Sequence, residues 1–311
     1  MHNYTKILIS VVFGMLLLGL VMILSASSTY SALKFNAFYS LFSQQIIKVI
    51  VAIALMLGAA VIPYSFYKKH AKNLMLFIII LLVITFIIAA KVKGAGRWIS
   101  FFAFSFQPSE LSKIVLIVYL SALLEKKKHV LQSFRNGLSY PLGATMLVVG
   151  LVLIQPNVST AMIIMSTGLA LIFVAGANLK HMFSIAATGL SLGGIAMMIM
   201  PHSRVRVMTY VNSLMNGGDI NTQVRQAKIA LGSGGVTGLG IGHSRQSDLF
   251  LPESYGDFIF SVLGEELGFI GAIAVMVAYL SIIVIGILIA KRTKDDFGQL
   301  RQIAFQPLLF V

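Results

Sequence analysis

Eight hydrophobic segments run through the chain, and each is close to the length that crosses a lipid bilayer. A membrane-spanning helix needs about 20 predominantly apolar residues. The segments cover residues 7–24, 44–62, 73–90, 109–124, 138–154, 158–175, 182–200 and 258–290, and residues 303–311 look like the start of a ninth. With 58% hydrophobic and only 11% charged residues, the chain is too apolar for a soluble domain. The sequence predicts an all-α, polytopic membrane helix bundle that forms a single transmembrane domain over residues 1–311.

The connections between these segments differ in charge. Lysine and arginine gather near residues 68–72, 126–135, 180 and 291–301, together with Lys6. Because basic residues accumulate in the cytoplasmic loops of membrane proteins, this pattern places the N-terminus in the cytoplasm. The chain carries a formal net charge of +14 but no basic run with interleaved aromatic residues, so nucleic acid is not expected as a partner. Cysteine is absent, which excludes disulfides, thiolate metal ligands and cysteine nucleophiles.

The connection at residues 201–257 is the first candidate for a functional region. It lies on the extracytoplasmic side between the seventh and eighth segments, and it is long and rich in glycine. Within it Val224, Ala227 and Leu231 follow helical spacing and Gly232 comes next, which predicts a short amphipathic helix with a glycine stop. The glycine-dense run at 232–242 is no P-loop, because no Gly-Lys-Ser/Thr follows, although its backbone amides could receive an anion.

The acidic residues are few enough to be considered one by one as a general base. Asp257 stands out because it lies at the junction between the long loop and the last hydrophobic segment. Two interpretations are equally open there: a general base, or an N-cap of the following helix. Glu265 and Glu266 lie two turns farther into the same predicted helix. A carboxylate at that depth is costly without a partner, so we expect at least one of the two to pair with a basic residue.

Several basic residues are also candidates for a binding site. Lys48 and Lys113 fall inside hydrophobic segments, where a charge usually has a function, although Lys113 follows Glu110 at a spacing that also allows a plain ion pair within the helix. The arginines on the extracytoplasmic side are Arg97, Arg204, Arg206 and Arg245. Such a set suits a diphosphate or lipid headgroup, because the guanidinium fork matches phosphate oxygens. Attraction to anionic phospholipids is the alternative.

Several stretches of the chain closely resemble one known family. They read GAGRWI at 94–99 followed by FQPSELSK at 106–113, QPNVSTA at 155–161, QAKIALGSGG at 226–235, GIGHSRQ at 240–246 and LPESYGDFIFSVLGEELG at 251–268. In this order and spacing they resemble the FtsW/RodA/SpoVE (SEDS) family of bacterial cell-wall proteins. The variant Ser244-Arg245-Gln246 is more similar to the division-associated FtsW branch than to the RodA branch. The chain departs from the family pattern at Asn157, where an acid is usual, and at Gly256.

The resemblance implies a function, and it assigns roles to individual residues. The protein would be an inverting peptidoglycan glycosyltransferase that polymerises lipid II at the outer face of the bacterial cytoplasmic membrane, with residues 201–257 as its catalytic loop. The family's catalytic carboxylate falls on Asp257, which would act as general base. Basic side chains would stabilise the undecaprenyl diphosphate leaving group, with or without Mg²⁺ or Mn²⁺. The expected substrate-binding set is Arg97, Glu110, Lys113, Gln155, Arg204, Arg206, Arg245 and Glu253, supported by Glu265, Glu266 and Lys48.

The resemblance also implies partners and a longer chain. A class B penicillin-binding protein and other divisome or elongasome proteins would be the partners. The family usually has ten spans, so a chain of this length is expected to be incomplete at its C-terminus. Two other functions remain open: a lipid II flippase, which would use the same buried charges without a general base, and a scaffold that recruits a transpeptidase.

Overall fold

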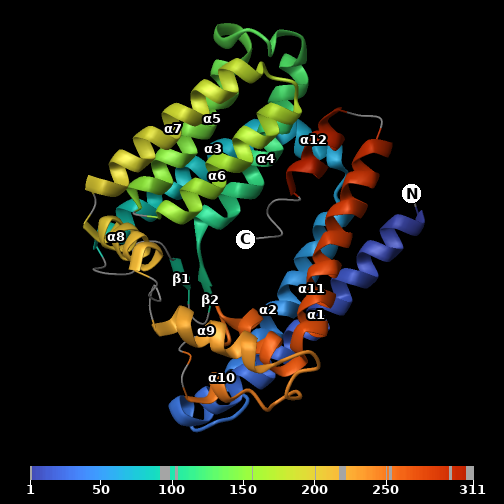
Figure 1. The fold of residues 1–311 in the computed structure, drawn as a ribbon. Helices are drawn as coiled ribbons and strands as arrows, with labels where there is room; N and C mark the ends of the chain where they lie inside the picture. Colours follow the sequence, from blue (N-terminus) through green and yellow to red (C-terminus); the bar gives the residue numbers. More distant parts are fainter. Residues whose placement is uncertain are drawn as a thin grey trace. The chain divides into compact units, whose positions relative to one another are not determined.

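The computed structural model describes residues 2–91, 99–101, 104–155, 157–199, 201–216, 222–249, 251, 254–293 and 296–305. Each predicted hydrophobic segment up to residue 290 lies on a helix (Figure 1). The long helices are α1 (His2–Phe35), α2 (Ser40–Val61), α3 (Tyr64–Lys91), α4 (Pro108–Lys127), α5 (Ser139–Ile154), α6 (Val158–Val174), α7 (Leu179–Ile199) and α11 (Ile259–Arg292). The other helices are η1 (Lys128–Val130), the π-helix η2 (Phe134–Leu138), α8 (Pro201–Asn216), α9 (Thr222–Ser233), α10 (Arg245–Leu249) and α12 (Asp296–Phe305).

Five of these helices are long and apolar enough to cross a membrane, counting only the described residues. They begin at Asn3, Ser40, Tyr64, Phe134 and Ile259. The structure is therefore a bundle of apolar helices, as the sequence predicts. The all-α prediction needs one correction, because strands β1 (Ile99–Phe101) and β2 (Phe104–Phe106) form a short antiparallel hairpin.

The chain folds into two compact units. Unit 1 contains residues 62–190 and 284–311, and unit 2 contains residues 2–61 and 191–283. Helices α7 and α11 contribute residues to both. The two units are described separately below.

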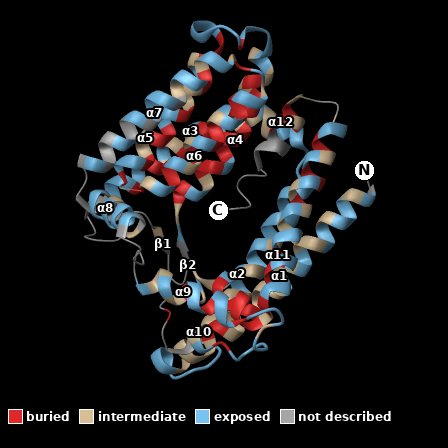
Figure 2. Ribbon diagram, in the orientation of Figure 1, coloured by how far each residue is buried: buried red, intermediate tan, exposed pale blue. Residues whose placement is uncertain are grey.

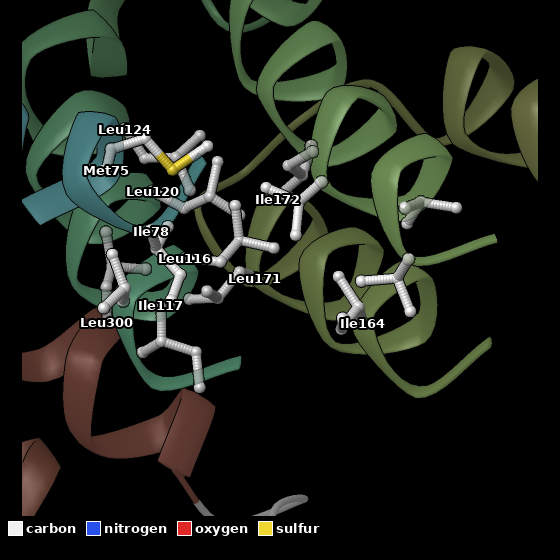
Figure 3. Close-up of a cluster of buried hydrophobic side chains, with 14 of the residues drawn as sticks. Met75, Ile78, Leu116, Ile117, Leu120, Leu124, Ile164, Leu171, Ile172 and Leu300 are labelled. Atoms are coloured by element: carbon white, nitrogen blue, oxygen red, sulfur yellow. The ribbon is translucent and has the colours of Figure 1, made fainter. Parts of the chain in front are cut away.

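Unit 1 has its hydrophobic core where α3, α4, α5 and α6 pack together (Figure 3). Ile78, Leu116, Leu120 and Ile164 are almost completely buried in this core. The local sequence favours the ends of the helices. Pro108 occupies the first turn of α4, where its missing N–H costs nothing, and the α4 C-terminus carries lysines that complement the helix dipole.

Ion pairs join the helices at one end of unit 1. Lys68 at the start of α3 pairs with Glu125 near the end of α4 at 2.7 Å, and Lys128 pairs with Asp296 of α12 at 2.8 Å. These residues come from three of the connections that the sequence assigns to one side of the membrane, so their meeting agrees with that assignment.

Unit 2 has its core between α1 and the first half of α11. Met22 and Ala26 of α1 pack against Val262 and Leu263 of α11. In contrast, α2 has no buried residue. Figure 2 shows the buried residues of unit 2 gathered near α10 and the start of α11, while α1 mixes intermediate and exposed residues and most of α2 is exposed. The loop that carries the candidate base lies at this buried region.

Candidate functional site

The helix α11 is interrupted in its first third, and the glycine run fills the interruption. Gly268 has φ 66° and ψ −167°, which breaks the helical hydrogen-bond pattern. The carbonyls of Glu265 and Glu266 accept hydrogen bonds from the amides of Leu239 and Gly240, at 3.0 and 2.9 Å. Beyond the break, the amide of Phe269 donates to Gly235 at 2.9 Å. A broken helix in a membrane must have its freed backbone groups satisfied by protein, and the glycine run does this.

Only glycine fits at several of these positions. A Cβ atom on Gly268 would lie 2.3 Å from the backbone nitrogen of Gly238, and the positive φ already disfavours other residues. A Cβ on Gly238 would lie 2.1 Å from the carbonyl oxygen of Glu266, and one on Gly234 would lie 2.0 Å from that of Gly264. The glycine-dense composition therefore reflects close backbone contact.

The sequence suggested that backbone amides of the glycine run could bind an anion. In the structure, amides near the centre of this run are already hydrogen-bonded within the protein. The amides of Gly238, Leu239 and Gly240 all donate to backbone carbonyls, and that of Gly242 donates to the Ser25 hydroxyl at 3.1 Å. For Leu239 and Gly240 the physical reason is the break in α11, whose freed carbonyls accept hydrogen bonds from these amides.

Glu265 holds the start of α10. Its Oε2 atom accepts a hydrogen bond from the Ser244 hydroxyl at 2.6 Å, and its Oε1 atom accepts one from the Arg245 amide at 3.1 Å. The Ser244 hydroxyl also accepts from the Ser247 amide at 3.1 Å, as an N-cap does. Glu265 is 1% exposed, so these donors replace water around its carboxylate.

Glu266 is equally buried and links three segments. Its Oε1 atom accepts a hydrogen bond from the hydroxyl of Ser25 on α1, which in turn accepts from the Gly242 amide. Among the described residues neither Glu265 nor Glu266 forms an ion pair with the basic residue that the sequence led us to expect. Hydroxyl and amide donors from adjacent segments take that place, because the glycine run brings backbone amides close to both carboxylates.

Asp257 lies in the turn just before α11, and its side chain is exposed. The turn is held on α1: the Ser254 hydroxyl donates to the Ala26 carbonyl at 3.2 Å, and the rings of Tyr255 and Tyr30 lie 5.1 Å apart. The Asp257 carboxylate makes no hydrogen bond or ion pair within the described ranges, and the first α11 amides bond to backbone carbonyls of the turn. Of the two interpretations, the structure therefore disfavours an N-cap and leaves an accessible carboxylate.

The rest of the long loop is more helical than predicted. The amphipathic helix is α9, but its buried residues are Ala227 and Ala230, whereas Leu231 is 42% exposed. Helix α8 carries Arg204, which is exposed, and Arg206, whose side chain is outside the described part. Arg245 is the first residue of α10 and is exposed.

A second group of predicted residues lies in unit 1. Lys113 is buried at 6% exposure in α4, and its ammonium group lies 2.7 Å from Glu110, which is half exposed. The intrahelical ion pair that the spacing allows is therefore present. It provides a counter-charge for a cation inside an apolar helix.

Polar side chains around this pair connect the ends of three helices. Asn157 caps α6 by accepting from the Thr160 amide at 3.3 Å, and it donates to the Ser109 hydroxyl at 3.4 Å. The amide nitrogen of Gln155 donates to the Leu82 carbonyl of α3 at 2.9 Å. Gln155 is 2% exposed, and its side-chain oxygen has no hydrogen-bond partner among the described residues. The structure thus brings together the two motifs at 106–113 and 155–161.

The remaining predicted residues are not part of either group. Lys48 is exposed on α2. Arg97 and Glu253 lie outside the described residues. Among the residues that the structure covers, no group of three or more His, Asp or Glu side chains could hold a metal ion.

Comparison with known proteins identifies the family. A model of the FtsW/RodA/SpoVE family, described as "cell cycle protein", matches residues 5–311. The chain belongs to the FtsW/RodA/SpoVE family. Two curated relatives are similar over most of its length. A probable peptidoglycan glycosyltransferase FtsW from Geobacter metallireducens is 31% identical over 310 residues, covering 99% of this chain and 83% of the relative. Stage V sporulation protein E from Bacillus subtilis is 32% identical over 295 residues, covering 94% and 80%.

Two solved structures are similar in fold to this chain. The crystal structure of Thermus thermophilus rod shape determining protein RodA matches with a TM-score of 0.68 at 20% identity, covering 97% of this chain and 80% of that one. A chain from a peptidoglycan synthase complex that coordinates polymerization and crosslinking matches with a TM-score of 0.77 at 21% identity, covering 97% and 83%. Together with the apolar helices, the family makes this chain a multi-pass membrane protein.

Sequence reasoning missed Ser25 and Ser244, the hydroxyl partners of the two buried glutamates. Serine is common in both helices and loops, and Ser25 lies 241 residues from Glu266. Ser244 offered one signal, since Ser, Thr, Asp and Asn are the usual residues just before a helix. Nothing local distinguishes Ser25 from its neighbour Ser28.

Proposed function

We propose that the protein is a peptidoglycan glycosyltransferase that polymerises lipid II, with Asp257 as general base. The proposal rests on the environment of Asp257. This residue is exposed and its carboxylate makes no hydrogen bond to the described residues. It lies just before the N-terminus of α11, on a turn that is hydrogen-bonded to α1. A base must reach its substrate's proton, and this carboxylate is not occupied by the protein. The names of the curated relatives support the reaction class.

The proposed reaction transfers a glycosyl unit with inversion. The 4-hydroxyl of one disaccharide attacks the anomeric carbon of another, and the bond from that carbon to the diphosphate oxygen breaks. Asp257 accepts the hydroxyl proton as the new glycosidic bond forms. The departing diphosphate carries the bonding electrons and does not need full protonation, so no second carboxylate is required as general acid.

Positive charge near the diphosphate would lower the activation free energy of the transfer, because it stabilises the negative charge that develops on the leaving group. The side chains that we propose for this role or for substrate binding are Arg97, Lys113, Arg204, Arg206 and Arg245. Glu110 holds Lys113 by its ion pair, and Gln155 and Glu253 complete the proposed set. No step is assigned to Mg²⁺ or Mn²⁺, because the described residues do not form a metal-binding group.

The proposed setting is the bacterial cytoplasmic membrane. The eight hydrophobic segments of the sequence would cross it as one transmembrane domain, with the N-terminus in the cytoplasm and the loop at 201–257 outside; five helices among the described residues are long and apolar enough to do so. A class B penicillin-binding protein would be the partner that crosslinks the glycan. The synthase complex among the similar structures supports a partner of this kind.

The decisive experiment compares lipid II polymerisation by wild type and Asp257→Asn, each purified with its cognate transpeptidase. Wild type is expected to make glycan chains, and the variant is expected to lose at least about 100-fold in rate, because an amide cannot accept the proton. Asp296→Asn is the matched control, since this acid lies in unit 1 and pairs only with Lys128 among the described residues.

If Asp257→Asn polymerises lipid II at the wild-type rate, Asp257 is not the general base. A wild-type protein that moves lipid II across vesicle membranes but makes no glycan would instead favour the flippase. Both variants must fold and bind the transpeptidase as wild type does, which size-exclusion chromatography and thermal unfolding can check.

A further inference from the structure

We propose that Ser25 of α1 is a positioning residue for Asp257, acting through Glu266 and the loop that begins at Gly242. The inference rests on the proposed function, because it takes Asp257 as the group whose position matters. It concerns a residue outside the catalytic loop, in the first helix of the chain.

One hydroxyl group joins three segments at Ser25. It donates a hydrogen bond to Oε1 of Glu266 on α11, and it accepts one from the amide of Gly242 at 3.1 Å. These partners lie 241 and 217 residues away in the sequence. All three residues belong to unit 2, as does Asp257. Ser25 therefore fixes α1, the end of the glycine run and α11 to each other.

The burial of Glu266 makes this hydroxyl difficult to replace. Glu266 is 1% exposed, and its Oε2 atom has no hydrogen-bond partner among the described residues. If the Ser25 hydroxyl is removed, Oε1 loses its hydroxyl donor and the Gly242 amide loses the Ser25 oxygen as acceptor, which leaves the carboxylate only the backbone amides of Gly242 and Ser244 nearby among the described residues. Since buried polar groups are costly when unpaired, the loop or the carboxylate must shift to recover partners or reach water.

A series of contacts carries such a shift from Gly242 towards Asp257. Glu265, next to Glu266, holds Ser244 and the start of α10. The carbonyl of Gln246 then accepts from the amide of Leu251 at 2.9 Å, and Leu251 is buried. The chain next meets α1 again at Ser254, whose hydroxyl bonds to the Ala26 carbonyl.

Helix α1 thus holds the loop at both ends. Ser25 accepts a hydrogen bond from Gly242, at the end of the glycine run. Ala26 and Tyr30 contact Ser254 and Tyr255, just before Asp257. Asp257 has no hydrogen bond of its own to the described residues, so its position is determined by these neighbours. A general base must lie within about 3 Å of the proton that it abstracts, and a 1 Å displacement can cost about 100-fold in rate.

The test measures both the reaction and the loop. Ser25→Ala, purified with the transpeptidase, is expected to lower kcat for lipid II polymerisation about 10- to 100-fold while KM changes less than about twofold. Hydrogen–deuterium exchange of the same protein is expected to become faster for amides between residues 239 and 257, and to stay unchanged in α6. A merely global loss of stability would increase exchange in both regions.

Two sets of controls isolate the hydroxyl. Ser28→Ala makes the same change one turn away on α1, at a hydroxyl that bonds only to the Ser25 carbonyl of its own helix among the described residues, and it is expected to keep wild-type kcat and exchange. Ser25→Thr and Ser25→Val have almost the same shape and differ in the hydroxyl. Threonine is expected to retain most of kcat and valine to lose it, even if Ser25→Ala folds poorly.

The outcomes separate this inference from the proposed function. If wild type polymerises lipid II and Ser25→Ala does so equally fast, the positioning role is overturned and the function stands. The role is also overturned if kcat falls while exchange at 239–257 does not change, or if valine is as active as threonine. If wild type makes no glycan, the proposed function fails and the inference fails with it as a catalytic role, whatever the exchange data show.

Discussion

At the scale of single residues, the buried charged side chains of the described helices, Lys113, Glu265 and Glu266, have polar partners of two kinds. Lys113 has a charged partner one turn away, Glu110. Glu265 and Glu266 have neutral partners from distant segments, the hydroxyls of Ser244 and Ser25. Spacing along a helix reveals the first kind, because neighbours at i and i+3 are fixed by helical geometry. It cannot reveal the second, which exists only after the chain has folded.

The Lys113–Glu110 pair can be tested with a double-mutant cycle. Glu110→Gln leaves a buried ammonium group without its counter-charge. We therefore expect the free energy of unfolding to fall by about 1–2 kcal/mol, which lies between the losses typical of exposed and of buried ion pairs. The double variant Glu110→Gln/Lys113→Met is expected to be more stable than the sum of the single variants predicts. Additive losses in thermal unfolding of the purified proteins would show that the two side chains act independently.

At the scale of secondary-structure elements, the break in α11 organises the site. The sequence at 258–290 predicts one long span. The structure divides the element at Gly268 and fills the gap with residues 234–240. The break exposes carbonyls that hold the glycine run, and the run then places amides beside Glu265 and Glu266. A local departure from helical geometry thereby determines the path of the glycine run.

Gly268→Ala tests the break. The new Cβ atom would lie 2.3 Å from the Gly238 nitrogen on a backbone with φ +66°, so we expect a loss of about 3 kcal/mol or more in stability. Gly232→Ala is the control in the same loop, because nothing lies within 4 Å of its added Cβ, and a change within about 1 kcal/mol is expected. Thermal unfolding in detergent measures both, and equal melting temperatures for Gly268→Ala and wild type would contradict the steric argument.

At the scale of the whole molecule, the membrane orientation is the central prediction. The ion pairs Lys68–Glu125 and Lys128–Asp296 gather basic connections at one end of unit 1. Ser109 lies at the opposite end of α4 from Glu125 and accepts a hydrogen bond from Asn157, the N-cap of α6. The positive-inside rule assigns the first end to the cytoplasm.

The natural absence of cysteine makes this orientation directly testable. Thr237→Cys, on the exposed glycine run, is expected to react with a membrane-impermeant maleimide in intact cells, and Ser133→Cys only after the membrane is permeabilised. Both positions are exposed, so a difference in labelling reports on the side of the membrane. The reverse labelling pattern would contradict the proposed topology.

The sequence by itself determined the helical class of the fold, the presence of a helix at each of the eight hydrophobic segments, the polar loop and the motifs that define the family. These features depend on local composition and spacing, such as runs of about 20 apolar residues or a lysine three residues after a glutamate. Only the tertiary structure showed that the Asp257 side chain makes no capping hydrogen bond among the described residues, that the amides of Leu239 and Gly240 bond to carbonyls of α11, and that Ser25 donates to Glu266. Those outcomes depend on which distant segments compete for each buried donor and acceptor, and no local pattern records that competition.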